Sequence, residues 1–161
     1  MPVDGDLLRE LMRQWATGVT LVTVQGGDGP HGMTVSSFTS LSLDPPLILI
    51  SLEKGSRTHQ MVSDTGRFAV VLLHVGQQSI AERFAGGIPD SRARFDGMPY
   101  RLSAGGSPIL DDGLAYLDCR VAESFGAGTH TIFIGEVLGG EVTGDAAPLL
   151  YFNRSYRQLG P

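Results

Sequence analysis

The N-terminal segment of the chain carries apolar side chains at helical spacing. They recur at every third or fourth position, and charged side chains occupy most of the positions between them. Asp6 can cap the start of a helix, and Gly18 can end it. The pattern predicts an amphipathic helix whose apolar face consists of Leu7, Leu8, Leu11, Met12 and Trp15.

Strand patterns follow this helix. Val19–Val24 is apolar and β-branched, and the turn-forming cluster Gly26–Gly32 brings the chain back into a second extended segment, which indicates a β-hairpin. The next apolar run, Leu47–Leu52, follows a corner at Pro45 and Pro46. A strand covered on both faces has such a run, so we expect it at the centre of a sheet.

Two short helices are predicted in the middle of the chain, each with a glycine after its last turn. The first has a serine at the position of an N-cap, and the second has two apolar side chains one turn apart. They cover Ser56–Ser63, capped by Ser56 and ended by Gly66, and Gln77–Ala85, with Ile80 and Phe84 on one face and Gly86 at its end.

The other segments are strands, apart from a polar, turn-rich stretch over Pro89–Gly106. Strands outnumber helices by roughly two to one, without the regular alternation that a parallel doubly wound sheet requires. The pattern predicts a mainly β fold, an antiparallel barrel that is closed or partly closed, in one domain over residues 1–161. These strands are predicted at 67–73, 114–125, 130–143 and 149–159.

Hydroxyl side chains crowd the strand that precedes the Pro45-Pro46 corner. A buried hydroxyl without a partner costs about 1–3 kcal/mol, so several in succession need partners. Two interpretations stay open: an edge strand whose hydroxyls face water, or a strand along which a flat polar ligand lies close to the backbone. The residues are Thr34, Ser36, Ser37, Thr39, Ser40 and Ser42, and one regular strand would place Ser37 and Thr39 on the face of Val35 and the others on the face of Phe38.

A candidate anion site follows the apolar run. Ser56 and Thr58 offer hydroxyls at a helix start, where free N–H groups and the helix dipole favour negative charge. Lys54 and Arg57 add positive charge. The alternative is that Ser56 only caps the helix and that the two basic side chains are solvated.

Composition narrows the function classes. A net charge of −5 and a pI near 5.2 argue against nucleic acid or an anionic membrane as the main partner. Cys119 is alone, no export signal or run of about 18 apolar residues occurs, and we expect a cytoplasmic protein. The histidines are scattered without metal-binding spacing, and no nucleophile elbow or G-x-G-x-x-G fingerprint occurs, so we expect no metal, no covalent catalysis and no Rossmann domain.

Several blocks together identify the chain as similar to a known family. In this order and spacing, from Leu8 to Leu159, they resemble the short-chain flavin reductases, the reductase components of two-component flavin-dependent monooxygenases. The segment Thr34–Pro46 is the most specific part. The blocks are "ATGVTLVTV", "HGMTVSSFTSLSLDPPLILISL", "KGSRTHQMV", "GRFAVVLL", "IAERFAG", "HTIFIGEV" and "PLLYFNRSYRQL".

This resemblance implies a split β-barrel that binds FMN or FAD, with NADH or NADPH as electron donor. It further implies a homodimer with the flavin near the subunit interface, and an oxygenase component that receives the reduced flavin. The implied flavin contacts are Thr34, Val35, Ser36 and Ser37 along the ring and ribityl chain, Ser51 and Glu53 at the border of the groove, Lys54, Ser56, Arg57 and Thr58 at the phosphate, and Arg83, Phe84, Ala85 and Tyr156 elsewhere around the groove.

The resemblance also implies a role for His130 beside the nicotinamide. The family pattern before this histidine is Gly-Asp-His, whereas this chain has Gly128-Thr129-His130. The missing carboxylate affects the orientation and charge that the ring would have. A histidine bonded to backbone at a strand end is the alternative interpretation.

Three rival functions stay open on the sequence. An FMN-binding electron carrier would use the same barrel without turning over NAD(P)H. An oxidase of the pyridoxamine-phosphate type would need more basic residues than the chain offers. A structural dimer would use the hydroxyl-rich segment only as a sheet edge.

Overall fold

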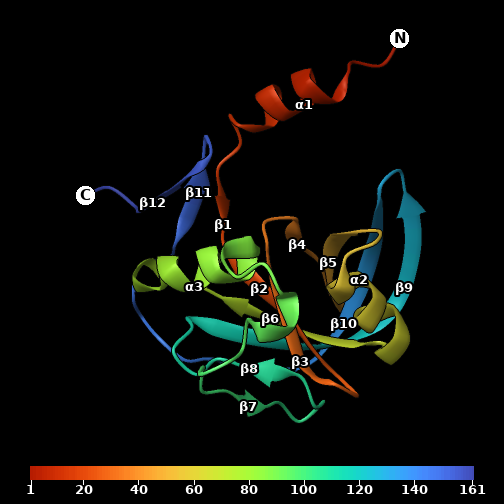
Figure 1. Cartoon of the computed structure of the whole chain (residues 1–161), viewed down its shortest axis with the longest axis vertical. Coiled ribbons are helices and arrows are strands. Elements are labelled where there is room, and N and C mark those ends of the chain that lie inside the picture. The colour runs from red at the N-terminus through yellow and green to blue at the C-terminus, as the bar shows by residue number, and fades with distance from the viewer.

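The computed structural model describes residues 1–161, and an antiparallel sheet of seven strands forms its body (Figure 1). The strand order is β3-β2-β6-β9-β10-β5-β4, so the sequence neighbours β3 and β4 form the two edges. Apolar β-branched segments supply the inner strands. The strands are β2 (Thr20–Gly26), β3 (Gly29–Val35), β4 (Phe38–Leu43), β5 (Pro46–Glu53), β6 (Arg67–Leu72), β9 (Ala115–Ala127) and β10 (His130–Val142).

Smaller elements complete the fold. A three-stranded sheet has the order β1-β11-β12, and β7 pairs with β8. Short 3-10 and π turns flank the shortest of the three helices. The elements are β1 (Thr17–Gly18), β7 (Arg101–Leu102), β8 (Pro108–Ile109), β11 (Leu150–Phe152), β12 (Ser155–Arg157), the helices α1 (Gly5–Met12), α2 (Arg57–Thr65) and α3 (Gln78–Glu82), and the turns Val75–Gln77, Arg83–Gly87 and Ser91–Ala93.

The hydroxyl-rich segment is not one strand, and this part of the prediction is wrong. Extended pairing stops at Val35 and resumes at Phe38, so Thr34 lies at one edge of the sheet and Thr39 at the other. Only Ser36 and Ser37 join the two edges. Curling of the sheet brings the edges together without pairing them, and the predicted split, mainly β architecture is confirmed.

The predicted hairpin forms, but its turn is tighter than the glycine cluster indicates. β2 and β3 pair from Thr20 with Val35 to Gly26 with Gly29, which leaves two residues at the turn. His31 therefore lies within β3. Gly29 has φ +116°, a conformation that side chains with a Cβ rarely adopt, and this glycine permits the tight turn.

β5 is paired on both sides, but it is second from the edge rather than central. Its buried side chains alternate, with Ile48, Ile50 and Leu52 in the core and Leu49 only partly covered. The apolar run indicated cover on both faces, whereas the second face is incompletely covered in the isolated chain. The most extensively buried long strands are β2 and β6, which are neighbours in the sheet.

Helix α2 agrees with its prediction to within two residues at its C-terminal end. Ser56 caps it by accepting from the His59 N–H at 3.2 Å, and Gly66 ends it with φ +66°. The second predicted helix is divided into a 3-10 turn, α3 and a π turn in which Gly86 has φ +107°. Glycine at these positions allows the left-handed ends.

The core forms two clusters, one on each face of the sheet. One includes Val22, Ile50 and Phe68 together with Met61 and Val62 of α2. The other lies against α3 and includes Leu21, Val71, Phe84, Phe95, Ile109 and Leu149. Alternate side chains of β2 enter different clusters, as strand geometry requires.

Helix α1 forms as predicted but projects from the body beside the β11-β12 hairpin (Figure 1). Its N-cap is Asp4 rather than Asp6, because the Asp4 carboxylate accepts the Leu7 N–H at 2.8 Å. The helix ends at Met12, so Gly18 is not its terminator and pairs with Leu150 in β1 instead. None of its residues is buried.

Candidate functional site

Several of the residues that sequence predicts for flavin binding meet where β5 leads into α2. Glu53 lies opposite His130 in the β5-β10 register, and Ser51 lies opposite Ile132. The Lys54 N–H donates to the carbonyl oxygen of Thr129 at 2.9 Å, which fixes the β9-β10 turn beside the end of β5. Strand pairing therefore brings together carboxylate, ammonium and imidazole groups from distant parts of the sequence.

Lys54 lies over a glycine of β9. A Cβ placed on Gly126 would lie 2.9 Å from the Lys54 Nζ, so a side chain there would displace the ammonium group. The exposed Lys54 side chain thus crosses the β9 end of the hairpin at close range. The glycine leaves room for this charge beside the end of β9.

Ser37 connects the split in the sheet to β5. Its hydroxyl donates to the carbonyl oxygen of Ser51 at 2.6 Å, and the Ser51 N–H donates to the Ser37 carbonyl oxygen at 3.1 Å. The Ser37 hydroxyl oxygen keeps its capacity to accept a hydrogen bond. Ser36 is exposed and lines a small, largely apolar cavity of about 300 Å³ together with Phe38.

The N-terminus of α2 offers free donors. The N–H groups of Arg57 and Thr58 precede the first intrahelical bonds and have no partner in the chain. Thr58 itself is only 2% exposed, so its side chain packs inward. The backbone of this turn, more than the Thr58 hydroxyl, is available to an anion.

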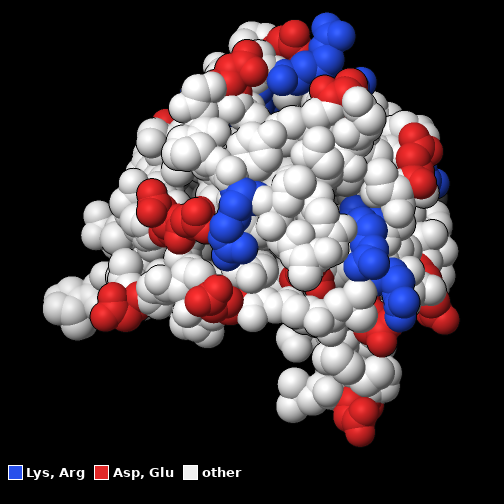
Figure 2. Space-filling model, turned by 90° about the horizontal axis from the view of Figure 1, so that it is seen from below, with Lys and Arg blue, Asp and Glu red and all other residues white.

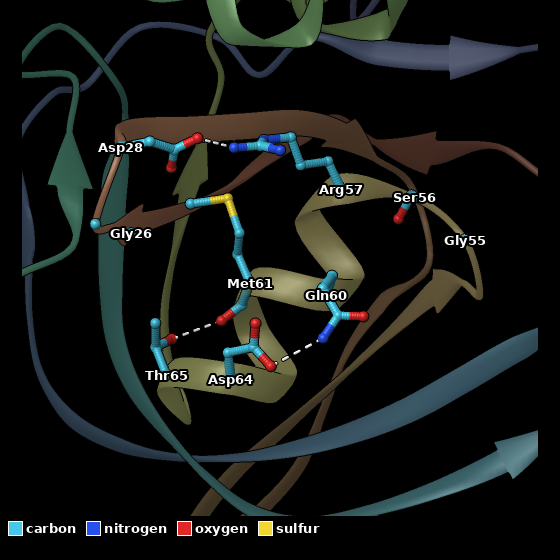
Figure 3. Close-up of a pocket in the computed structure, with 10 residues that line it drawn as sticks. Gly26, Asp28, Gly55, Ser56, Arg57, Gln60, Met61, Asp64 and Thr65 are labelled. Atoms are coloured by element: carbon cyan, nitrogen blue, oxygen red, sulfur yellow. Dashed lines mark hydrogen bonds and ion pairs between the residues drawn. The ribbon is translucent and has the colours of Figure 1, made fainter.

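A cavity of about 510 Å³ opens between α2 and the β2-β3 turn (Figure 3). Figure 3 shows Arg57 reaching from the start of α2 toward Asp28, with which it forms an ion pair, while Met61 points toward Gly26. The Arg57 Nε also donates to the His31 Nε2 at 2.7 Å. Ser56 and Arg57 are the predicted flavin-binding residues that line this cavity.

Thr34 and Val35, at the end of β3, bond to different neighbours. The Thr34 hydroxyl donates to the Ala81 carbonyl oxygen at 2.6 Å, and the Val35 carbonyl oxygen accepts from the Thr20 hydroxyl at 2.7 Å. Both residues thus have internal partners that the sequence alone did not indicate.

Arg83 and Phe84 contact the loop that follows α3. The Arg83 guanidinium donates to the carbonyl oxygens of Arg94 at 2.6 Å and Asp96 at 2.5 Å. Phe84 is buried and its ring packs edge-on against Phe95, with centroids 4.9 Å apart. These contacts order the loop and the core, whereas the next residue, Ala85, is exposed.

Tyr156 of β12 lies near the same end of the molecule. Its ring packs edge-on against Tyr151 with centroids 5.1 Å apart. Burial raises the pKa of the Tyr156 hydroxyl, and Tyr151 and Glu82 raise it further, so the group stays protonated and can donate a hydrogen bond at neutral pH.

His130 is exposed at the start of β10. Its Nδ1 lies 2.9 Å from the Thr129 hydroxyl, so Thr129 interacts with the ring at the position where the family pattern has a carboxylate. A hydroxyl can donate or accept, whereas a carboxylate only accepts. Thr129 therefore orients the imidazole without adding a negative charge.

Sequence reasoning missed Asp28 and His31 at this site. Both belong to the β2-β3 hairpin, far in sequence from Arg57, and only the packing of α2 on the hairpin brings them together. The signal was the pair of polar residues in "GGDGPHG", which the turn pattern accounted for without a function.

Three further features of the molecule are the charge on its surface, its potential metal ligands and the apolar character of its helices. Figure 2 shows one face on which acidic and basic side chains lie interspersed among uncharged atoms, without one continuous basic area. No group of three or more His, Cys, Asp or Glu side chains is arranged to hold a metal ion. None of the helices has both the length and the apolar character needed to cross a membrane.

The split β-barrel places hydroxyls at its split and basic groups at a helix start, an arrangement that can hold a polar cofactor with an anionic group. Residues 12–160 match the family described as "Flavin reductase like domain". The chain therefore belongs to the flavin reductase family. The predicted resemblance is confirmed.

Individual relatives agree with this assignment. The chain is 41% identical over 158 residues to a flavin reductase (NADH) of Kitasatospora aureofaciens, over 96% of this chain and 81% of the relative. It is 36% identical to the solved NADH:FAD oxidoreductase of Streptomyces globisporus, with a TM-score of 0.92, over 100% of this chain and 96% of that chain. It is 37% identical to a nitrilotriacetate monooxygenase component B of Mycobacterium thermoresistibile, with a TM-score of 0.90, over 97% and 87%.

These findings confirm the enzyme class. The chain is a flavin reductase, an oxidoreductase that transfers reducing equivalents from NADH or NADPH to FMN or FAD. The two rival classes that lack this reaction, an electron carrier and a structural dimer, are not supported by the family.

Proposed function

We propose that this chain is an NADH-dependent reductase that supplies reduced flavin to a separate oxygenase or halogenase. Relatives named as NADH-dependent support the choice of donor. Relatives include a reductase subunit of a flavin-dependent monooxygenase and the reductase component of a two-component tryptophan halogenase, which supports transfer to a partner enzyme. We infer one flavin-binding domain over residues 1–161 that acts in the cytoplasm, where NADH is regenerated.

The observation that carries this proposal is the continuous run of polar groups, both acceptors and donors, from the split of the sheet to the start of α2. Ser37 and Ser51 lie at the split, Glu53 and Lys54 follow along the chain, and the free N–H groups of Arg57 and its neighbour end the run. Hydroxyls, a cation and helix N–H groups in this order fit the polar ring edge, ribityl chain and phosphate of a flavin.

The bound flavin would supply an acceptor for hydride from the nicotinamide. The chain has then to hold the two rings in contact and exclude other geometries. We assign Ser36 and Ser37 to the ring edge, Ser51 and Glu53 to the border, and Lys54 to the phosphate. Ser56, Arg57 and the backbone of Thr58 complete the phosphate site.

We assign His130 to the nicotinamide side of this groove. It lies across from Glu53, next to the proposed flavin border, and its exposed ring is held through Thr129. In this position it would bind and orient the nicotinamide rather than exchange a proton, because hydride transfer needs no protein acid or base at the carbon.

The residues near α3 have a different proposed role. Thr34, Arg83 and Phe84 already bind internal partners, so we infer that they shape the ring side of the groove. Val35 would contribute its backbone, Ala85 is exposed and free to touch the flavin, and Tyr156 would close the groove with its hydroxyl.

We further propose a homodimer, and the main support is α1. All five residues predicted for its apolar face are exposed, and Trp15 is 67% exposed. A continuous apolar stripe of this kind on a projecting helix indicates a protein interface. A second copy would cover it and would also close the flavin groove, which is open on the single chain.

An anaerobic assay of NADH and NADPH with FMN, FAD and riboflavin in parallel tests this function. We expect NADH oxidation that depends on added flavin, with bleaching of the visible flavin absorbance and a slower rate with NADPH. A flavin that binds but is not reduced by either nucleotide would overturn the proposal and favour an electron carrier. The His130→Ala variant should lower the rate or raise the NADH concentration required, with flavin affinity retained.

A further inference from the structure

His31 is a buried polar residue to which the proposed function gives no role. It is 2% exposed within β3, and its Nε2 accepts a hydrogen bond from the Arg57 Nε at 2.7 Å. Because Nε2 accepts, the neutral ring carries its proton on Nδ1. That Nδ1 is buried and has no hydrogen-bond partner.

Packing alone does not explain a histidine at this position. A buried N–H group without a partner destabilises the fold, and an apolar side chain of similar volume would avoid this cost. The contact with Arg57 is the one hydrogen bond that the ring makes. The benefit of His31 must therefore lie in what it does to Arg57.

The guanidinium of Arg57 has five N–H donors. Its Nε–H group is bonded to His31, and one terminal nitrogen pairs with the carboxylate of Asp28. In the ion pair with Asp28, the Arg57 side chain is 40% exposed and the Asp28 side chain is 50% exposed. An ion pair that is this accessible to water holds its two side chains in one geometry only weakly. The buried acceptor on His31 is the better anchor, and it leaves three N–H groups of the guanidinium for a ligand.

The anchored side chain lies at the proposed phosphate site. Arg57 is the first residue of α2 and lines the same cavity as Ser56, next to the free backbone N–H groups of the helix start. Without an anchor, an arginine at a helix start extends into water, where it keeps many rotamers. Fixing it in advance lowers the entropy lost when an anion binds.

We propose that His31 is a positioning residue that holds the Arg57 guanidinium across the mouth of this cavity, ready to bind the phosphate of the flavin. The proposal rests on the proposed function, since it assumes a flavin phosphate at the start of α2. It requires a neutral ring, because a proton on Nε2 would replace the acceptor by a donor and place two cations together.

The test compares flavins that differ in the phosphate alone. Affinities for FMN and riboflavin are measured by fluorescence titration for the wild type, Arg57→Ala, His31→Leu and the double variant. We expect Arg57→Ala to lower the ratio of FMN to riboflavin affinity by at least roughly tenfold, and His31→Leu by roughly three- to tenfold, with riboflavin binding nearly unchanged. The double variant should lose no more than Arg57→Ala alone.

Two further variants separate positioning from folding. His31→Gln offers a carbonyl oxygen to Arg57 and should recover part of the ratio, whereas a merely structural loss would not be recovered. His59→Leu is the matched control, since it removes another histidine of this region that bonds to Thr131, and it should leave the ratio unchanged.

The outcomes distinguish the two hypotheses. If Arg57→Ala leaves the ratio unchanged, the phosphate does not bind at Arg57 and the assignment of the site itself fails. A second outcome is that Arg57→Ala lowers the ratio, while His31→Leu lowers the affinities for FMN and riboflavin equally or its effect on the ratio adds fully to that of Arg57→Ala in the double variant. Either result would overturn the positioning role of His31 and leave the phosphate site in place.

Discussion

Helices α1 and α2 are both amphipathic and both begin at a side-chain N-cap, but only α2 buries its apolar face. Met61 and Val62 of α2 join the larger core cluster, whereas no residue of α1 is buried. The apolar repeat is the clearer one in α1, since the apolar side chains of α2 are only the neighbours Met61 and Val62. The difference teaches that periodicity predicts a helix and its apolar side, while the surface that covers this side depends on the whole assembly.

The largest expected effect tests the buried face of α2. Val62→Asp places a carboxylate without a partner in the core, and we expect a loss of more than about 3 kcal/mol in the free energy of unfolding. Ser63→Asp, at the exposed neighbouring position, should cost less than about 0.5 kcal/mol. Urea unfolding followed by circular dichroism measures both, and similar losses would show that α2 does not pack as described.

The second effect tests the exposed face of α1. Leu8→Asp combined with Leu11→Asp should weaken self-association by at least about 2 kcal/mol, roughly thirtyfold in Kd, because two leucines would no longer enter an apolar interface. Analytical ultracentrifugation over a concentration series measures this. Glu10→Ala on the same helix is the control, and an unchanged Kd in the double variant would exclude α1 from the interface.

A smaller effect compares the two N-caps. Ser56→Ala should lower the free energy of unfolding by about 1 kcal/mol, since α2 is part of the cooperative core. Asp4→Ala should cost only a few tenths of a kcal/mol in the monomer, because an exposed terminal helix frays without unfolding the rest. Equal losses in thermal unfolding would mean that α1 is already docked within the monomer.

The smallest effect concerns the pH dependence of the contact between His31 of β3 and Arg57 of α2. Burial lowers the pKa of His31, Arg94 and Arg92 lower it further, and Asp90 opposes them. His31 therefore binds a proton more readily in the unfolded chain than in the folded chain. The stability that the neutral ring contributes is fully present above pH 6.5. It is lost as the pH falls through 6.5 toward the lowered pKa of the folded state. Unfolding curves at several pH values should show this slope.

The variant His31→Gln serves as the control for this titration. It keeps an acceptor for Arg57 but removes the titrating ring, so the slope should flatten below pH 6.5. A slope that persists in the variant would assign the acid sensitivity to other groups.

The sequence predicted most of the strands and helices, because the patterns that indicate them are local. The hairpin, α2 with its Ser56 cap and the long strands β9 and β10 occur where the patterns predicted them. The strand predicted at 149–159 is wrong, because a turn at Asn153 and Arg154 divides it into β11 and β12. The break at Ser36 and Ser37 did not follow, because hydroxyl residues suit a strand edge and a turn equally. Nothing local indicated that this point joins the two edges of one sheet.

The part of the candidate site that forms one continuous segment of the sequence was predictable. The segment from Ser51 to Arg57 lies along one strand end and one helix start, so its residues stay close together in any fold that has these elements. His31 and Asp28 were missed because their link to Arg57 depends on how α2 packs on a distant hairpin. Such contacts are set by tertiary structure, which periodicity does not describe.

The edge strand β4 has a consequence for the behaviour of the protein in concentrated solution. Its outer side pairs with no other strand, and Thr39 and Ser40 are exposed along it. Unpaired strand edges can recruit strands from other molecules, and short hydroxyl side chains make such recruitment less favourable than β-branched apolar ones. Because Leu41 and Leu43 are also exposed on β4, we expect the serines and threonines of this strand to reduce, but not to abolish, pairing between edges of different molecules.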